Sequence, residues 1–161
     1  MNISPLLEQF IRNLQVAGAQ IALGEAEEAQ VIASCEGLLD FTLPETRADY
    51  PPTCPLSKLD KVQHALFNGR FGVAENGAIW LEDEDLPHRL LPFITEHLLL
   101  RIDASRLVGT MHEAYKRIAA CDWGFGVFIS GPSKTADIEQ SLVYGAHGAR
   151  ELTVIINLSS V

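Results

Sequence analysis

The second half of the sequence alternates short apolar segments with segments of helical spacing. Continuous apolar, β-prone runs occupy residues 98–102, 124–129 and 152–158, and such runs are typical of strands buried on both faces. The spacing of apolar residues predicts helices over residues 105–118 and 135–144. Strands that alternate with helices pair in parallel through right-handed crossovers. We therefore expect an α/β fold with a mostly parallel sheet flanked by helices.

The first half of the sequence predicts a less regular order of elements. A helix is predicted from Ser4, a residue type that caps helices, to about Gly18. Residues 30–34 are short and β-prone and are predicted to form a strand. The proline-rich residues 42–57 are predicted to form a loop or an extended crossing segment, because proline disfavours both helix interiors and central strands. Residues 58–68 are predicted to form a short helix.

A tight turn is the clearest local signal in the chain. Two β-prone runs, residues 71–74 and 78–81, are joined through Glu75-Asn76-Gly77, and Asn-Gly is among the strongest hairpin signals. The acidic run at residues 82–85 is predicted to be a solvated loop. These residues predict an antiparallel hairpin followed by an exposed segment.

Composition limits the class of protein. A chain of 161 residues with 47% hydrophobic residues predicts a single domain over residues 1–161. Apolar runs are interrupted well before the roughly 20 residues that a membrane span needs, and the first residues do not resemble a secretory signal, so we expect a cytoplasmic location with no membrane partner. A net charge of −9 with scattered basic residues argues against nucleic acid.

The cysteines do not predict a cofactor or metal site. Cys35, Cys54 and Cys121 are odd in number and far apart, which favours reduced, isolated thiols over a disulfide framework, a zinc site or an iron-sulfur cluster. His64, His88 and His112 lie in no motif and are expected at the surface.

The junction between the run at 124–129 and the helix at 135–144 is the strongest candidate binding site. Ligands of open α/β sheets bind at such junctions, because a helix start offers unpaired N–H groups to an anion. The candidate ligand-binding residues combine close backbone approach, hydroxyl groups and charge: Ser130, Gly131, Ser133, Lys134, Thr135 and Asp137. The alternative is a helix cap that binds nothing.

This segment resembles a known family. Residues 130–139, S-G-P-S-K-T-A-D-I-E, and Gly145-Ala146-His147-Gly148 resemble paired motifs near the end of proteins of the lactate-utilization (LUD) domain family, which includes subunits of the LutC/YkgG type. Residues 72–77 and 96–98 resemble two further family segments. The resemblance implies a three-layer fold similar to ribose-5-phosphate isomerases and CoA-transferases. It also implies a role beside two iron-sulfur partner proteins in converting L-lactate to pyruvate.

Three residues are candidates for acid-base or nucleophilic chemistry. His97 and His147 lie in family-like segments, and imidazoles can act as acids or bases near neutral pH. Glu75, with Asn76 and Gly77, resembles the E-N-G turn of CoA-transferases, where the glutamate attacks an acyl-CoA; the alternative is an exposed hairpin turn.

The leading hypothesis is a subunit of an L-lactate oxidizing system that binds a small anionic ligand between the Glu75 turn, His97 and residues 130–135. Two alternatives stay open. One is a CoA-transferase-like or sugar-phosphate enzyme that uses Glu75, and the other is a non-catalytic assembly module for iron-sulfur partners.

Overall fold

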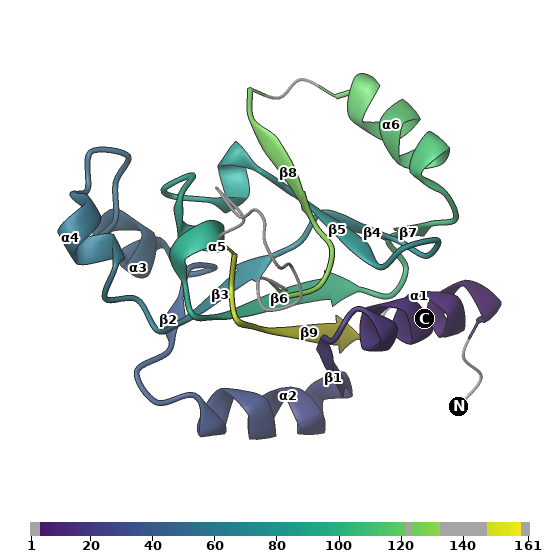
Figure 1. Cartoon of the computed structure of the whole chain (residues 1–161), viewed down its shortest axis with the longest axis horizontal. Coiled ribbons are helices and arrows are strands. Elements are labelled where there is room, and N and C mark those ends of the chain that lie inside the picture. Colours follow the sequence, from purple (N-terminus) through teal and green to yellow (C-terminus); the bar gives the residue numbers. More distant parts are fainter. Residues whose placement is uncertain (1–3, 122–123, 133–147, 159–161) are drawn as a thin grey trace, which may run out of the picture.

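The computed structural model describes residues 4–121, 124–132 and 148–158. Its centre is a five-stranded sheet, called sheet A here, in which every neighbouring pair of strands is parallel (Figure 1). In spatial order its strands are β1 (Gln20–Leu23), β9 (Glu151–Asn157), β6 (His97–Asp103), β3 (His64–Asn68) and β2 (Leu39–Asp40). The predicted α/β fold with a mostly parallel sheet is confirmed.

A second sheet of four strands, called sheet B here, packs against sheet A. In spatial order its strands are β7 (Leu107–Val108), β4 (Phe71–Val73), β5 (Ala78–Glu82) and β8 (Gly126–Ile129). The predicted hairpin is present as β4 and β5, which pair antiparallel. Strand β8 pairs antiparallel with β5, so the expectation that this run joins the parallel sheet is wrong.

Helices cover the outer faces of both sheets (Figure 1). The described helices are α1 (Pro5–Val16), α2 (Gly24–Ser34), α3 (Pro44–Ala48), α4 (Leu56–Leu59), α5 (Leu91–Ile94) and α6 (Met111–Ala119), with a 3₁₀ turn at Asp83–Asp85. Val31 and Ile32 of α2 pack on one face of sheet A, against Leu99 and its neighbours. On the far face of sheet B, Ala114 and Ile118 of α6 pack against Trp80.

The largest part of the core lies between the two sheets. Leu98 and Leu100 of β6 face Ile79 and Leu81 of β5, and Phe10 of α1 joins the same apolar cluster. Each of these five side chains is at most 1% exposed. The order of layers is therefore α2, sheet A, a shared core that includes α1, sheet B and α6.

Several predicted elements differ from the structure. Residues 30–34 belong to helix α2 rather than to a strand, and β3 occupies residues where a helix was predicted. The proline-rich segment contains the short helices α3 and the start of α4. Helix α6 begins after its cap, Thr110, because residues 107–108 pair with β4. The helix predicted over residues 135–144 lies outside the described residues.

Every helix in the described part of the chain is too short or too polar to cross a membrane.

Candidate functional site

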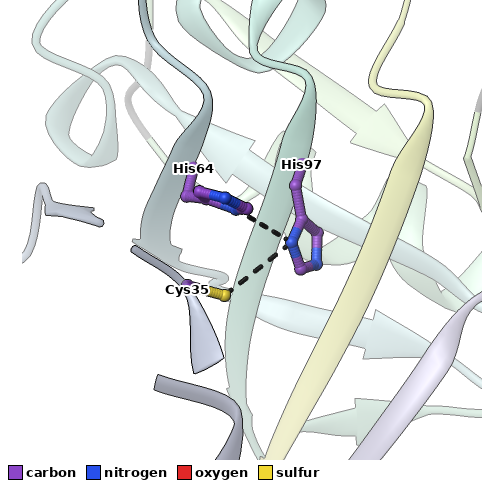
Figure 2. Close-up of side chains that lie close together, drawn as sticks. All are labelled: Cys35, His64 and His97. Carbon is purple, nitrogen blue, oxygen red and sulfur yellow. Dashed lines mark hydrogen bonds between the residues drawn. The ribbon is translucent and has the colours of Figure 1, made fainter. Parts of the chain in front are cut away.

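The parallel pairing of sheet A lines up the first residues of its strands. His64 is the first residue of β3 and His97 the first residue of β6, and the two are direct neighbours in register. Glu151, the first residue of β9, is the register neighbour of His97 on the other side. Cys35 ends helix α2 on the same face of the sheet and its sulfur lies beside His97 (Figure 2).

His97 is the centre of this group. It is buried, at 8% exposure. Its Nδ1 lies 3.1 Å from Nδ1 of His64 and 3.8 Å from Sγ of Cys35, and its Nε2 lies 2.8 Å from Oγ1 of Thr153. The Glu151 carboxylate lies 3.7 Å from Nδ1 of His97.

The contact with Thr153 favours the tautomer of His97 that carries its proton on Nε2. The Thr153 hydroxyl donates to Oε1 of Gln20 at 3.5 Å, so its oxygen is available to accept a hydrogen bond from Nε2–H of His97. Nδ1 of His97 then carries a lone pair that faces His64 and Cys35. The hydrogen bond that one ring nitrogen of a histidine makes commonly determines whether the other nitrogen carries a proton or a lone pair.

Burial favours the neutral form of this imidazole. Loss of hydration lowers the pKa of His97 below its ordinary value, and the neighbouring His64 lowers it further, while the Glu151 carboxylate acts in the opposite direction. Burial is the largest of these effects. A neutral His97 can accept a proton or coordinate a metal ion through Nδ1.

A pocket of about 430 Å³ opens beside the two histidines. It is lined by Gln63, His64, Glu96, His97, Arg150 and Glu151. The Arg150 guanidinium lies 3.9 Å from the Glu96 carboxylate, and its side chain is 83% exposed. The pocket therefore combines two carboxylates with an arginine and two imidazoles.

The turn that carries Glu75 lies at the end of β4. Glu75 is exposed, and its carboxylate accepts a hydrogen bond of 2.8 Å from the backbone N–H of Met111, the first residue of α6. Asn76 accepts a bond from the Ala78 N–H through its side chain. Gly77 adopts a φ of +75°, which the tight turn requires.

The structure brings two of the predicted ligand-binding segments together. The Ser130 hydroxyl donates to the carbonyl of Asn76 at 3.1 Å. Gly131, with a φ of +87°, lies against Ala17, close enough that a Cβ on Gly131 would lie 2.8 Å from the Ala17 Cβ. This places the start of the predicted loop beside the connection from α1 to β1.

Not all predicted site residues share one pocket. The described lining of the His97 pocket includes neither the Glu75 turn nor Ser130 and Gly131. Ser133, Lys134, Thr135, Asp137 and His147 lie outside the described residues. Their assignment as ligand-binding or catalytic residues stays a prediction.

Two residues of this site were not identified from the sequence. His64 was expected at the surface, yet it is half-buried and bonded to His97. Cys35 was expected to be isolated, yet it is buried beside the same imidazole. No motif surrounds either residue. Only the strand register and the end of α2 bring them to His97.

Comparison with known proteins agrees with this architecture of a parallel sheet backed by a second, mixed sheet. The sequence model of the LUD domain family matches residues 57–157. The chain therefore belongs to the LUD domain family.

Several curated proteins resemble parts of the chain. A protein named Lactate utilization protein C from Deinococcus radiodurans is 31% identical over 67% of this chain and 52% of its own length. A protein of the same name from Shouchella clausii is 34% identical over 52% of this chain and 39% of its own length. An uncharacterized protein of Neisseria meningitidis serogroup B is 36% identical over 52% of this chain and 37% of its own length. The chain thus spans about half or less of these relatives.

A solved structure shares the fold over nearly the whole chain. The crystal structure of a DUF162 family protein from Deinococcus radiodurans covers 98% of this chain with a TM-score of 0.71, and the match covers 99% of that protein. At 21% sequence identity, this likeness establishes the fold alone.

Proposed function

We propose that this chain is the LUD-domain component of a lactate-utilization system and binds a small carboxylate anion beside His97. One observation carries the proposal: the chain belongs to the LUD domain family and resembles several proteins named Lactate utilization protein C. The matched residues 57–157 include His64, His97 and Glu151. The proposal treats residues 1–161 as one LUD-type domain.

The residues around the pocket are suited to a hydroxy or keto acid. Arg150 is exposed enough to turn toward a ligand, and a guanidinium binds a carboxylate through two parallel hydrogen bonds. Glu151 can accept a hydrogen bond from a ligand hydroxyl, while His97 offers a neutral imidazole next to it. Ser130 and Asn76, which contact each other outside the described lining of this pocket, stay a separate candidate ligand-binding segment.

Electron transfer is assigned to partner proteins. Oxidation of lactate to pyruvate removes two electrons, and the resemblance to lactate-utilization subunits implies iron-sulfur proteins that accept them. An iron-sulfur cluster ordinarily requires four thiolates, whereas this chain has 3 cysteines. We therefore propose that the clusters belong to the partners.

The test is ligand-dependent thermal stability. A ligand that binds only the folded chain raises its melting temperature with concentration. We expect L-lactate or pyruvate to raise it, and CoA and nucleotides to leave it unchanged. Arg150→Gln should remove the response, while the matched control Arg12→Gln, on the exposed face of α1, should retain it. No response to either acid, for the chain alone or with its iron-sulfur partners, would contradict the proposal.

The observed contacts of Glu75 bear on the acyl-transfer alternative. Its exposed carboxylate is bonded to the first N–H of α6, which supports a role in holding the helix start. A response to CoA in the same melting experiment would favour acyl transfer. Stable co-purification with iron-sulfur proteins, without any response to a ligand, would favour the assembly module.

A further inference from the structure

We propose that Cys35, His64 and His97 form a binding site for one Zn²⁺ ion at the amino edge of sheet A. The sulfur of Cys35 and one ring nitrogen of each histidine lie within 4.8 Å of one another. Figure 2 shows the three side chains converging from three elements. This inference is independent of the identity of the small ligand proposed above.

The spacing of the ligand atoms fits a tetrahedral ion. Zinc binds histidine nitrogen at about 2.0–2.1 Å and cysteine sulfur at about 2.3 Å, which separates tetrahedral nitrogen pairs by about 3.4 Å and nitrogen-sulfur pairs by about 3.6 Å. The observed separations are 3.1 Å between the two Nδ1 atoms and 3.8 Å between Nδ1 of His97 and the sulfur. Both separations from Nδ1 of His97 are thus within a few tenths of an ångström of the tetrahedral values. The Cys35 sulfur lies within 4.8 Å of a ring nitrogen of His64, and binding of an ion requires this pair to reach about 3.6 Å.

The orientation of His97 is already that of a metal ligand. Histidines that bind metal commonly donate their second ring N–H to a fixed acceptor, which holds the ring and directs the other lone pair. Thr153 provides this acceptor at 2.8 Å from Nε2. Thr153 is itself buried, at 1% exposure. The lone pair of Nδ1 therefore faces the point where an ion would lie.

The chemistry of the three donors selects the ion. One thiolate with two imidazoles suits zinc, whereas calcium and magnesium require oxygen ligands. Cys35 lies on the inner side of the group, and the two histidines line the pocket. The fourth position would therefore face the pocket, close to Glu151. One thiolate and two neutral imidazoles leave a bound Zn²⁺ with net positive charge, which would attract an anion.

Without metal the same atoms form a hydrogen-bonded cluster. His64 can donate its Nδ1–H to Nδ1 of His97, and His97 donates to Thr153. Such a cluster would satisfy these groups without any ion. The experiment must therefore separate metal binding from a purely structural network.

Metal content and Co²⁺ spectra make that separation. The full chain is purified without a metal-affinity tag, stripped with a chelator and titrated with Zn²⁺ against a chromophoric chelator. We expect saturable binding of one ion per chain. With Co²⁺ in place of Zn²⁺ we expect the visible bands of tetrahedral cobalt and a thiolate-to-cobalt charge-transfer band.

Matched variants assign the ligands. Cys35→Ala should abolish the charge-transfer band and lower zinc affinity by more than the roughly 10- to 100-fold that loss of a ligand-orienting partner causes. His64→Gln should also weaken binding by more than this. Cys121→Ala and His112→Gln, both at exposed positions, should bind as the unchanged chain does. Circular dichroism verifies that each variant is folded.

Two results would overturn the proposal. One is the absence of saturable binding to the unchanged, folded chain. The other is binding that persists undiminished in both Cys35→Ala and His64→Gln. If Cys35→Ala does not fold, the presence or absence of the charge-transfer band in the unchanged chain still decides whether a thiolate binds the ion.

Discussion

The two ring nitrogens of His97 have different partners, and this difference determines what the residue can do. Nε2 is bonded to Thr153, whereas Nδ1 faces His64, Cys35 and the Glu151 carboxylate. A buried polar group without a hydrogen bond lowers the stability of the folded protein, so each partner of a buried imidazole contributes to that stability. As an acceptor for Nε2–H, the hydroxyl of Thr153 favours the tautomer in which Nδ1 carries no proton.

Thr153→Val tests this arrangement at the scale of one residue. Valine has nearly the shape of threonine but no hydroxyl, so Nε2–H of His97 would lose its acceptor. We expect the free energy of unfolding, measured with urea in the presence of a chelator, to fall by about 1–3 kcal/mol. Nitrogen-15 shifts of the ring should report a proton fixed on Nε2 in the unchanged chain and a mixture in the variant.

Thr153→Ser is the matched control for this prediction. Serine retains the hydroxyl, so the proton should stay on Nε2 even though a buried methyl group is lost. A Thr153→Val variant as stable as the unchanged chain, with the same ring shifts, would show that the hydroxyl does not orient His97.

The site was only partly predictable from residue types. His97 was identified because it lies in a family-like segment, and the Asn76 and Ser130 segments, identified separately, are in contact. His64 was not identified, because its partnership with His97 arises from the register of β3 on β6. A contact between residues 33 positions apart has no local sequence signal, and the same holds for Cys35.

At the scale of elements, local signals were reliable only where they were specific. The Asn-Gly turn correctly predicted the hairpin of β4 and β5. A strand was predicted at residues 30–34 because Val31 and Ile32 are β-prone. The prediction was wrong because the alanine and glutamate residues around them favour a helix. Residues 58–68 were predicted as a helix because Leu59, Val62, Ala65 and Leu66 recur at helical spacing. That spacing joins residues of two elements, since Leu59 ends α4 whereas Ala65 and Leu66 lie in β3, a short run with consecutive buried residues.

Glu75 supplies a prediction at the scale of a helix. Its carboxylate accepts a hydrogen bond from the first backbone N–H of α6. Thr110 caps the same helix, because its hydroxyl oxygen accepts a hydrogen bond from the backbone N–H of Glu113. Removal of a cap costs about 0.5–2 kcal/mol, and a negative charge at a helix start contributes about 0.3–1 kcal/mol. We expect Glu75→Ala to lower the free energy of unfolding by about 1 kcal/mol, and Glu75→Gln to lower it by less.

Amide hydrogen exchange of α6 locates the effect of these substitutions. Exchange should accelerate in the first turn of α6 in Glu75→Ala and stay unchanged in α1. Glu36→Gln, at an exposed position away from α6, is the control. If Glu75→Gln abolished a measured turnover while α6 remained protected, the cap would be an insufficient account of Glu75 and a chemical role would be favoured.

At the scale of the whole molecule, one apolar core connects the two sheets. Leu100 of sheet A and Ile79 of sheet B belong to the same buried cluster, with Phe10 of α1. Neither sheet can expose its inner face without exposing that of the other. We therefore expect the two sheets to unfold together rather than as separate units.

Trp80 allows this expectation to be tested. The chain has 2 tryptophans, so a Trp123→Phe background leaves Trp80, buried in sheet B, as the only fluorescent indole. In that background the urea transition followed by Trp80 should coincide with that followed by far-ultraviolet circular dichroism.

Leu100→Ala, in sheet A, should lower the free energy of unfolding by about 2–5 kcal/mol and shift both transitions equally. Val16→Ala, at a 77% exposed position, should change the free energy of unfolding by no more than about 0.5 kcal/mol. A Trp80 transition that does not move with Leu100→Ala would mean that sheet B keeps its fold when sheet A is destabilised, and that the shared core does not couple the two sheets.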